Sequence, residues 1–491
     1  MDNTRRKFLK KAGMATAAMT LTSSFLFGKS EEQKTNFLVF IADDVSWDDF
    51  GCYGNSDVKT PNIDRLAKKG LKCDNVYLTA SSCSPSRNSI LTGRYPHNTG
   101  AAELHSSPPD DMLSLPEVLK KNGYFTAHSG KFHMGKYIEK GFDVISRKIE
   151  EIGNSGSDTW LKTLKERPKD KPFFLWYAAL DAHRAWGENQ FSGKHDPEKI
   201  DPPFYLADGE RTRKDMAQYY DEIYRFDYRI GEVVDELKKQ GQLENTMIII
   251  MSDNGRPFPH SKTRVNDRGM KTPFIVYWPE KIKKHAESKS LISAIDIAPT
   301  IIDYADVDIP DSFQGHSFAK LIKKPHSKFR NYVFAEHNWH DFEAHERMIR
   351  DENYMYILNS RPNQPQMGPA DAIESPSMFE LKEIKAKGEL TPIQSDVFVT
   401  PRPKEELYDY REDPRQLINV ASVPKYQDVL KKLRAKLNQW MDETGDSVPK
   451  YLTKDWYLRE PGYIKTDAEG TRGEMPGAVN NATEINKKGP F

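Results

Sequence analysis

The sequence predicts an α/β protein with a mostly parallel central sheet, followed by a smaller α+β part with an antiparallel sheet. Short, continuous apolar runs recur along the first part of the chain, and amphipathic helical patterns lie between them. This alternation is typical of a parallel sheet covered by helices, because parallel strands need crossover connections. After about residue 345 apolar and polar residues alternate instead, which favours antiparallel strands.

Five apolar runs predict buried strands of the central sheet. They lie at residues 37–42, 125–129, 173–180, 247–251 and 274–278. Runs without polar alternation are typical of parallel strands that are covered on both faces. Most of these runs end directly in polar side chains, and α/β proteins keep their sites at the carboxyl edge of the sheet. We therefore expect the polar residues that follow the strands to meet at one edge.

Helices are predicted between and after these strands. The clearest covers residues 215–240, where Tyr219, Ile223 and Ile230 belong to a series of apolar residues at steps of three and four. Shorter helices are predicted at residues 60–66, 115–123 and 295–304. The charged stretch at residues 138–171 is predicted to lie at the surface.

The C-terminal part is predicted to hold a hairpin, a further strand and one amphipathic helix, at residues 347–358, 406–409 and 426–441. Residues 359–404 are rich in Pro, Gln and Ser and are predicted to be long loops. The Gly- and Asn-rich tail beyond Asp467 has little to hold it. The predicted organisation is a leader at residues 1–30, a larger domain at 31–345 and a C-terminal subdomain at 346–491.

The composition is that of a polar protein without a dominant charge. Lys+Arg and Asp+Glu each total 72, so the formal net charge is zero, and nucleic-acid binding by bulk electrostatics is excluded. The three cysteines, Cys52, Cys73 and Cys83, are too few for a disulfide framework, and their odd number leaves at least one unpaired. If Cys83 is modified, Cys52 and Cys73 could form a disulfide; two buried free thiols are the alternative.

The N-terminus has the features of an export signal. Residues 4–10 read TRRKFLK, which resembles a twin-arginine motif, and a mildly apolar run follows from Ala12 to Phe27. That run is short and rich in Ala, Thr and Ser, so it predicts no membrane span and no stable membrane anchor. We expect export by the twin-arginine route to the periplasm or the exterior. An amphipathic N-terminal helix is the alternative.

Two acidic pairs follow predicted strands. Asp43 and Asp44 come after the first apolar run, and Asp253 and Asn254 come after the run at 247–251. Together they supply side-chain oxygens, which are the ligands of a hard divalent cation, and the absence of histidine and cysteine pairs argues against zinc. The sequence therefore predicts a calcium site, with magnesium less favoured. The alternative is that each pair only caps the loop or helix that follows it.

Cationic side chains follow the strands or lie in loops at the same predicted edge: Arg87, Lys131, His133, His183 and Lys262. A sulfate or phosphate group needs such donors, because its charge cannot be buried unpaired. Histidine is also the side chain best suited to transfer a proton near neutral pH. Any one of these residues taken alone is more often an ordinary surface residue, so the interpretation depends on their convergence.

The most specific motif lies at residues 82–94, which read SCSPSRNSILTGR. Proline in the first turn of a helix fixes the backbone there without losing a hydrogen bond, so a helix is predicted to begin near Cys83 and to carry Arg87. The helix N-terminus offers free N–H groups and partial positive charge to an anion. Cys83 is therefore predicted to take part in anion chemistry, and a buried structural cysteine is the alternative.

The order of these motifs resembles that of the type I sulfatases. The resemblance covers about residues 35–310, and a weaker similarity is found at residues 406–409. It is carried by Asp43-Asp44, SCSPSR at 82–87, GKFH at 130–133, DAHR at 181–184 and DNG at 253–255. It implies an alkaline-phosphatase-like catalytic domain over the larger part of the chain and a C-terminal subdomain that completes the substrate pocket. It also implies a sulfated glycan as substrate.

The resemblance implies that Cys83 is oxidised to formylglycine by a formylglycine-generating or sulfatase-maturating enzyme. The hydrate of this aldehyde would attack sulfur, which is covalent catalysis in two steps. The implied ligands of the calcium ion are Asp43, Asp44, Asp253, Asn254 and residue 83 itself. Arg87 and Lys131 would hold the sulfate charge. His183, with Lys262 beside it, would protonate the leaving group, and His133 would take the remaining hydroxyl proton as sulfate is released.

Within this family, residues 254–259 (NGRPFP) and the run around Cys83 resemble the heparan N-sulfatases, also called N-sulfoglucosamine sulfohydrolases or sulfamidases. The chain departs from that group because Lys262 stands where arginine is expected and Ala182 where proline is expected. The loops at 188–212 and 360–404 do not follow the group either. The resemblance therefore implies a glycan sulfatase, with an N-sulfate such as that of N-sulfoglucosamine as the leading candidate among glycan sulfates.

Three alternatives remain open. The chain could be an O-sulfatase that acts on another sulfated polysaccharide, or a phosphoester or phosphonate hydrolase of the same superfamily. The Asp/Asn ligand set disfavours the second of these, because such relatives tend to use more histidine and aspartate ligands. A catalytically inactive carbohydrate-binding relative is the third, and it would keep Cys83 as a thiol.

Overall fold

The computed structural model describes residues 33–366, 368–459, 468 and 470–491 of the chain. The leader predicted at residues 1–30 lies outside these described residues. Within them, none of the helices combines the length and the apolar character that crossing a membrane would require.

The central sheet has eight strands within the described residues, in the order β4-β3-β5-β1-β6-β7-β2-β8. Their bounds are β1 (Asn36–Ala42), β2 (Leu71–Tyr77), β3 (Phe125–Gly130), β4 (Val144–Ser146), β5 (Phe173–Ala178), β6 (Thr246–Ser252), β7 (Phe274–Tyr277) and β8 (Ala286–Ser293). Neighbouring strands are parallel except where β7 runs antiparallel to β6 and to β2. The prediction of a mostly parallel sheet is confirmed, and β1, β3, β5 and β6 end at the same edge.

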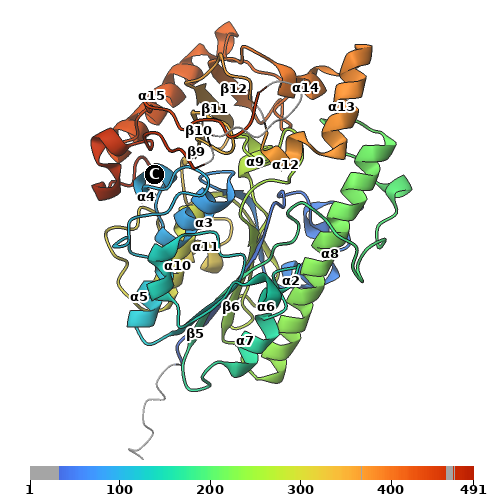
Figure 1. Ribbon diagram of the computed structural model, residues 1–491. Coiled ribbons are helices and arrows are strands. Elements are labelled where there is room, and N and C mark those ends of the chain that lie inside the picture. The colour runs from blue at the N-terminus through green and yellow to red at the C-terminus, as the bar shows by residue number, and fades with distance from the viewer. Residues whose placement is uncertain (1–32, 367, 460–467, 469) are drawn as a thin grey trace, which may run out of the picture. The chain divides into compact units, whose positions relative to one another are not determined.

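Helices cover both faces of this sheet (Figure 1). One face carries α3 (Cys83–Thr92), α5 (Leu115–Lys121), α10 (Ile297–Tyr304) and α11 (Ala319–Lys323), and the other carries α2 (Pro61–Ala67), α7 (Trp160–Glu166) and α8 (Glu210–Lys239). Successive side chains of β1 point to opposite faces, so Phe37, Val39 and Ile41 pack in one apolar cluster, and Leu38 and Phe40 in the other. This double burial explains why the strand is apolar throughout.

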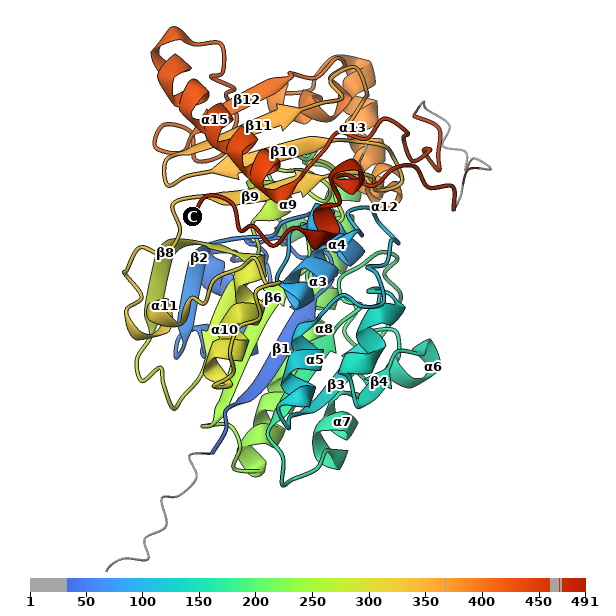
Figure 2. The same ribbon diagram turned by 90° about the vertical axis from the view of Figure 1, so that its left-hand side faces the viewer.

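The second sheet is antiparallel and has the order β12-β11-β10-β9 (Figure 2). Its strands are β9 (Val333–His337), β10 (Glu346–Arg350), β11 (Tyr354–Asn359) and β12 (Glu405–Asp409), and helix α15 (Gln427–Thr444) packs against it. Leu433, Leu437 and Trp440 of α15 are buried in one cluster with Phe334 and Ile349 of the sheet. The predicted hairpin, strand and helix are present. Strand β9 of this sheet lies before residue 346, the predicted start of the C-terminal subdomain. By their contacts, Asn36–Phe491 form one compact unit.

Two stretches contain more regular structure than the sequence pattern indicated. Residues 138–171 hold β4, α6 (Ile149–Ile152) and α7, and Trp160 and Leu164 of α7 are buried beneath the sheet. Residues 359–404 hold α12 (Ala370–Ile373), α13 (Pro376–Lys387) and α14 (Pro392–Ser395). Most of residues 138–171 do lie at the surface, as predicted, although Trp160 and Leu164 are buried. The prediction of long loops at 359–404 was wrong where α12, α13 and α14 form, because exposed charged residues hide the few apolar residues that anchor these helices.

Three strands were also missed, β2, β8 and β9. The edge strand β8 and its neighbour β2 each carry half-buried polar residues, so neither shows a continuous apolar run. The remaining short helices of the described residues are α4 (Pro96–Thr99) and α9 (Asp267–Met270).

The C-terminal tail is tied to the catalytic part of the chain, contrary to the expectation that little would hold it. The guanidinium of Arg94 donates hydrogen bonds to the carbonyl oxygens of Thr483 (2.8 Å) and Ile485 (3.0 Å) and to Oδ1 of Asn486 (2.6 Å). The side-chain amide of Gln314 donates to the carbonyl of Lys487 at 2.8 Å. These donors are distant in sequence, so no local pattern in the tail could reveal them.

All three cysteines are free thiols in this structure. Cys73 is fully buried, and burial raises the pKa of the half-buried Cys52 thiol to about 12. Protonated thiols in such surroundings are unreactive. Of the two alternatives for Cys52 and Cys73, the structure contains the free thiols.

Candidate active site

Two neighbouring strands of the central sheet deliver acidic side chains to one place. Strand β1 pairs in parallel with β6 up to its last residue, so Asp43 and Asp253 leave the sheet side by side. The backbone N–H of Asp44 donates to Oδ1 of Asp253 at 3.3 Å, and the side-chain amide of Asn254 donates to Oδ1 of Asp44. All four side chains are buried, as expected for the ends of central strands.

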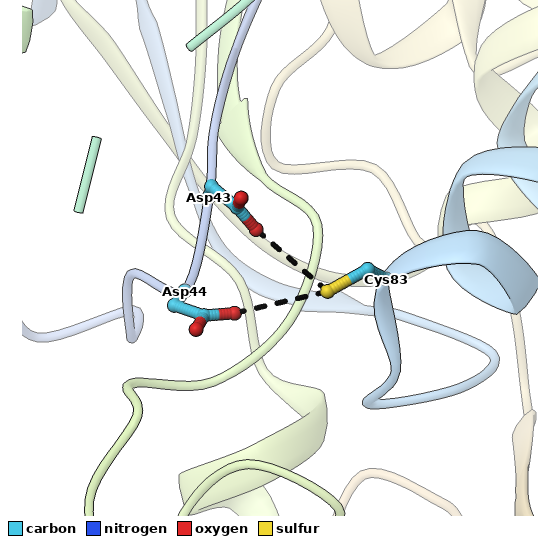
Figure 3. A group of neighbouring side chains, drawn as sticks. All are labelled: Asp43, Asp44 and Cys83. Carbon is cyan, nitrogen blue, oxygen red and sulfur yellow. Dashed lines mark hydrogen bonds between the residues drawn. The ribbon is translucent and has the colours of Figure 1, made fainter. Parts of the chain in front are cut away.

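Cys83 is the first residue of α3, and its side chain points at the acidic pair from β1 (Figure 3). The Sγ atom lies 3.7 Å from Oδ1 of Asp43 and 4.0 Å from Oδ1 of Asp44. Pro85 lies in the first turn of the helix, where its missing N–H has no intrahelical acceptor to lose. The helix therefore begins at the predicted position and directs its positive end at the same point.

Arg87 follows one turn later on α3 and is fully buried. Its Nε donates to Oδ2 of Asp253 at 2.7 Å, Nη2 lies 3.7 Å from Oδ1 of Asp43, and Nη1 donates to the carbonyl of Lys131 at 3.2 Å. The guanidinium therefore joins the two acidic pairs to the end of β3.

Lys131 follows directly after β3, because Gly130 allows the chain to turn there. Gly130 has φ +114°, and a Cβ at this residue would lie only 1.7 Å from the carbonyl oxygen of Ala178. The ammonium of Lys131 forms an ion pair with Oδ2 of Asp43 and lies 3.5 Å from Sγ of Cys83. A cation thus borders both the cysteine and Asp43.

Lys262 and His183 lie beside the other acid of the pair. The ammonium of Lys262 lies 2.7 Å from Oδ2 of Asp44 and 3.2 Å from Oδ2 of Asp371. Nε2 of His183 lies 4.0 Å and 3.9 Å from the same two oxygens. His183 is the most open of these groups, with 34% of its side chain exposed. It also borders a polar cavity of about 550 Å³ that includes Asn154, Asn189 and Arg229.

His133 lies near the site but does not join this network. Its Nε2 makes a hydrogen bond of 2.7 Å with Nδ1 of His105, and the ring of His105 stacks on Trp456. In the described part of the chain, no hydrogen bond or ion pair connects His133 with the other predicted site residues. Burial, with Lys131 and His105 nearby, lowers the pKa of His133 well below its ordinary value. The ring is therefore neutral, and its Nδ1 atom has no hydrogen-bond partner among the described residues.

The sequence pattern missed three residues that border the site, Asp371, His105 and His340. Asp371 reaches Lys262 from α12, and Nδ1 of His340 makes a hydrogen bond of 2.8 Å with the hydroxyl of Ser82, next to the cysteine. All three lie outside the sheet edge that guided the prediction. No local signal marks them, because they are placed by the loops and by the C-terminal part of the chain.

Burial and neighbouring charges shift the pKa values of Asp43 and Asp253 in opposite directions. Burial raises the pKa of Asp43 to about 6 against the effect of Lys131, with a further contribution from Asp253. Burial also acts to raise the pKa of Asp253, but Arg87, Lys131 and Lys262 together hold it below its ordinary value. Burial raises the pKa of the Cys83 thiol. The site thus contains poorly solvated carboxylates next to a protonated thiol, and it has the donors that a tetrahedral oxyanion needs.

The comparison with known families decides which kind of enzyme this is. The sulfatase family model matches residues 35–307, which is more than half of the chain, and it covers every residue of the site except those from the C-terminal part. The chain is a member of the sulfatase family. This sulfatase is therefore a hydrolase of sulfate esters or sulfamates. A second family model, the C-terminal region of N-sulphoglucosamine sulphohydrolase, matches residues 260–396.

Curated relatives of this sulfatase act on different glycans. An ulvan-active sulfatase of Formosa agariphila is 30% identical over 456 residues, which cover 81% of this chain and 74% of that protein. The human N-sulphoglucosamine sulphohydrolase is 28% identical, with 89% and 95% of the two chains covered. The sulfatase therefore resembles one enzyme named for its activity on ulvan and one named for N-sulphoglucosamine.

Solved structures confirm the alkaline-phosphatase-like fold. One was determined in complex with its substrate D-glucosamine-2-N,6-O-disulfate and aligns with a TM-score of 0.66 at 20% identity, over 84% of this chain and 98% of that chain. The phosphonate monoester hydrolase of Agrobacterium radiobacter aligns with a TM-score of 0.65 at 18% identity, over 88% and 100% of the two chains. At these identities the likeness concerns the fold alone.

The acidic side chains of the sulfatase fit a calcium ion. The oxygens of Asp43 and Asp44 and the sulfur of Cys83 lie within 4.8 Å of one another and are buried. The side-chain oxygen of Asn254 is buried without a hydrogen-bond partner among the described residues, so this lone pair is available to a ligand. Oxygen donors from three carboxylates and one amide suit a hard cation of this charge.

Proposed function

We propose that this sulfatase releases sulfate from a sulfated saccharide by means of a formylglycine made from Cys83 and a calcium ion held by Asp43, Asp44, Asp253 and Asn254. The observation that carries the proposal is the position of residue 83. Its side chain lies 3.7 Å and 4.0 Å from two carboxylates and 3.5 Å from the Lys131 ammonium. A nucleophilic oxygen there would lie between a hard cation and the donors for a sulfate group.

The unmodified thiol is unsuited to the reaction, which favours the proposed oxidation. A cysteine attacks as its thiolate, and burial raises the pKa of Cys83, so the thiolate is scarce at neutral pH. Conversion to the aldehyde hydrate supplies a hydroxyl nucleophile and a second hydroxyl from which the aldehyde can be restored. The proposal therefore requires a formylglycine-generating or sulfatase-maturating enzyme as a partner.

Each residue of the site has a proposed task. Arg87 and Lys131 orient the hydroxyl at position 83 and balance the charge of the sulfate group. His183, which lies beside the open cavity, protonates the leaving atom, and Lys262 keeps that side of the site cationic. His133, a neutral ring, accepts the proton of the second hydroxyl as sulfate is released. The calcium ion, when bound, supplies positive charge that polarises the sulfate oxygens and lowers the pKa of a coordinated hydroxyl.

The favoured substrate is an N-sulfoglucosamine unit of a heparan-type glycan. The match of residues 260–396 to the C-terminal region of N-sulphoglucosamine sulphohydrolase supports this choice, because the stretch includes Asp371, which lies 3.2 Å from Lys262 in the site. The polar cavity next to His183 offers hydrogen-bonding groups for sugar hydroxyls. An O-sulfatase on another sulfated polysaccharide is the second candidate, and the 30% identity to an ulvan-active sulfatase favours it.

We also propose that the chain is exported by the twin-arginine route, as the motif at residues 4–10 indicates, and works in the periplasm or outside the cell. In this proposal residues 31–345 carry the catalytic machinery and residues 346–491 complete the substrate pocket. The 3.2 Å contact between Oδ2 of Asp371 and Nζ of Lys262 supports such a role.

Peptide mass spectrometry across residue 83 tests the nucleophile. Conversion of cysteine to formylglycine lowers the residue mass by about 18 Da, and protein made with a competent maturation enzyme should show this change. An unchanged thiol in such a host contradicts the proposal and favours a binding protein. A panel of N-, 2-O-, 3-O-, 4-O- and 6-O-sulfated sugars then identifies the substrate.

The Cys83→Ala variant tests whether residue 83 carries the reaction. It should lose at least about a thousandfold in kcat, because no nucleophile remains, while the melting temperature stays close to that of the wild type. A rate near that of the wild type would refute the assignment.

A further inference from the structure

Asp371 brings a carboxylate from the C-terminal part of the chain to the catalytic edge of the central sheet. It lies in α12, within the stretch 359–404 that the sequence pattern predicts as loop. Its Oδ2 atom lies 3.2 Å from Nζ of Lys262 and 3.9 Å from Nε2 of His183. Its side chain is 19% exposed, and its neighbour His183 borders the polar cavity.

The two oxygens of this carboxylate differ in their hydrogen-bond partners. Oδ2 is engaged by Lys262, whereas Oδ1 is buried and has no hydrogen-bond partner among the described residues. A buried acceptor without a donor is costly, so such an atom in a site is suited to a donor that the substrate supplies. Burial acts to raise the pKa of Asp371, but Lys262 and His183 hold it below its ordinary value. The site therefore presents an anion next to the proposed proton donor of the leaving group.

The two candidate substrate classes differ in the charge of their leaving group. Hydrolysis of a sulfamate, R–NH–SO3−, with one water gives the sulfate dianion and the ammonium R–NH3+: the N–S bond breaks with its electron pair on nitrogen, and nitrogen gains two protons. Hydrolysis of an ester, R–O–SO3−, with one water gives sulfate, a neutral alcohol and a free proton. An aliphatic amine is mostly protonated at neutral pH, whereas an alcohol is neutral. An anion beside the leaving atom therefore favours the amine.

We propose that Asp371 is a specificity-determining residue, and that its carboxylate favours sulfamates, whose leaving group is an amine, over sulfate esters. This inference rests on the proposed sulfatase function and names the substrate class of the same site. The inference depends on the geometry of this carboxylate. Oδ2 contacts Lys262 and lies near His183, whereas Oδ1 has no donor among the described residues and can accept a hydrogen bond from the departing nitrogen.

The test compares two substrates on three variants. Glucosamine N-sulfate and N-acetylglucosamine 6-O-sulfate serve as probes for the wild type, Asp371→Asn and Asp371→Glu. Glu374→Gln is the matched control, because it removes one carboxylate from an exposed residue three positions away. Asp371→Asn should lower kcat/KM for the N-sulfate by about tenfold or more and for the 6-O-sulfate by less than about threefold. Asp371→Glu should recover part of the loss, and Glu374→Gln should match the wild type on both probes.

Inhibition by the product gives a second readout that a merely structural role would not change. Glucosamine, as an ammonium, should inhibit hydrolysis of an aryl sulfate more strongly than N-acetylglucosamine does, and Asp371→Asn should abolish this difference. Equal losses on both probes, with unchanged selectivity between the two inhibitors, would show that Asp371 only supports Lys262 and would overturn the inference.

The same experiment separates this inference from the function on which it rests. A wild type that hydrolyses only the O-sulfated probe overturns the amine preference and leaves the sulfatase proposal intact. A wild type that carries formylglycine at residue 83 but hydrolyses neither probe nor the aryl sulfate contradicts both.

Discussion

Nε of Arg87 donates a 2.7 Å hydrogen bond to Oδ2 of Asp253, and both side chains are fully buried. The pair joins helix α3, which begins with Cys83, to the end of strand β6, which supplies two of the proposed calcium ligands. A planar guanidinium can reach Asp253, Asp43 and the Lys131 carbonyl at once, and this explains why arginine occupies the position.

The first prediction concerns this guanidinium. Arg87→Lys keeps the charge but cannot make both hydrogen bonds and the ion pair of the guanidinium, so kcat/KM should fall about a hundredfold and the free energy of unfolding by about 3 kcal/mol. Steady-state kinetics and urea denaturation measure the two effects. Arg211→Lys, which changes an exposed arginine paired with Glu383, should alter neither quantity. Activity close to wild type in Arg87→Lys would speak against a role in holding sulfate.

The second prediction concerns the metal. Calcium added to metal-free protein should raise the melting temperature, because at a hundredfold excess over Kd a ligand of the folded state contributes about 2.7 kcal/mol. Asn254→Leu removes the unpartnered buried oxygen and should weaken calcium binding about tenfold or more, with magnesium giving a smaller shift than calcium in the wild type. Thermal unfolding without substrate measures this independently of activity. Equal stabilisation of the variant and the wild type would exclude Asn254 as a ligand.

The third prediction concerns the C-terminal tail. Deletion of residues 478–491 leaves Arg94 and Gln314 without acceptors that they use in the folded chain, so the free energy of unfolding should fall by about 3 kcal/mol or more. Asn486→Ala removes one of these acceptors and should cost about 1 kcal/mol. Urea denaturation of both variants gives the comparison. If the truncated protein is as stable as the full chain, the tail does not contribute as the structure indicates.

The fourth prediction concerns acid sensitivity and His345, which directly precedes strand β10 of the second sheet. Burial, with Arg347 nearby, lowers the pKa of His345 to about 3, whereas the unfolded chain takes up this proton near pH 6.5. Between these two values the unfolded state binds more protons, so the free energy of unfolding falls as the pH is lowered from 6.5. From pH 7 to pH 5 this residue alone should cost about 2 kcal/mol.

The His345→Gln variant measures that contribution. Its free energy of unfolding should depend less on pH between 7 and 5 than that of the wild type, by about the same 2 kcal/mol. His326→Gln, a change at an exposed histidine, should leave the pH dependence unaltered. A His345→Gln variant with the pH dependence of the wild type would show that His345 titrates normally in the folded chain.

The sequence by itself determined the five apolar strands of the central sheet and the acidic half of the site. Strands that are buried on both faces must be apolar throughout, so β1 and β6 are visible in the sequence, and parallel strands bring their carboxyl ends to one edge. Asp43, Asp44, Asp253 and Asn254 were predictable for this reason. Cys83 and Arg87 were predictable because the proline and the spacing of one helical turn are local signals.

Only the tertiary structure decided what surrounds these residues on the open side. Asp371, His105 and His340 come from loops and from the C-terminal part of the chain, and the tail is fixed by Arg94, far away in sequence. Helix α13 exposes most of its residues, and α12 has only four residues, so neither shows a periodic apolar pattern in the sequence. Local sequence encodes which residues a strand or helix buries, but contacts between distant loops depend on where the whole chain places them, and those contacts shape the pocket that selects the substrate.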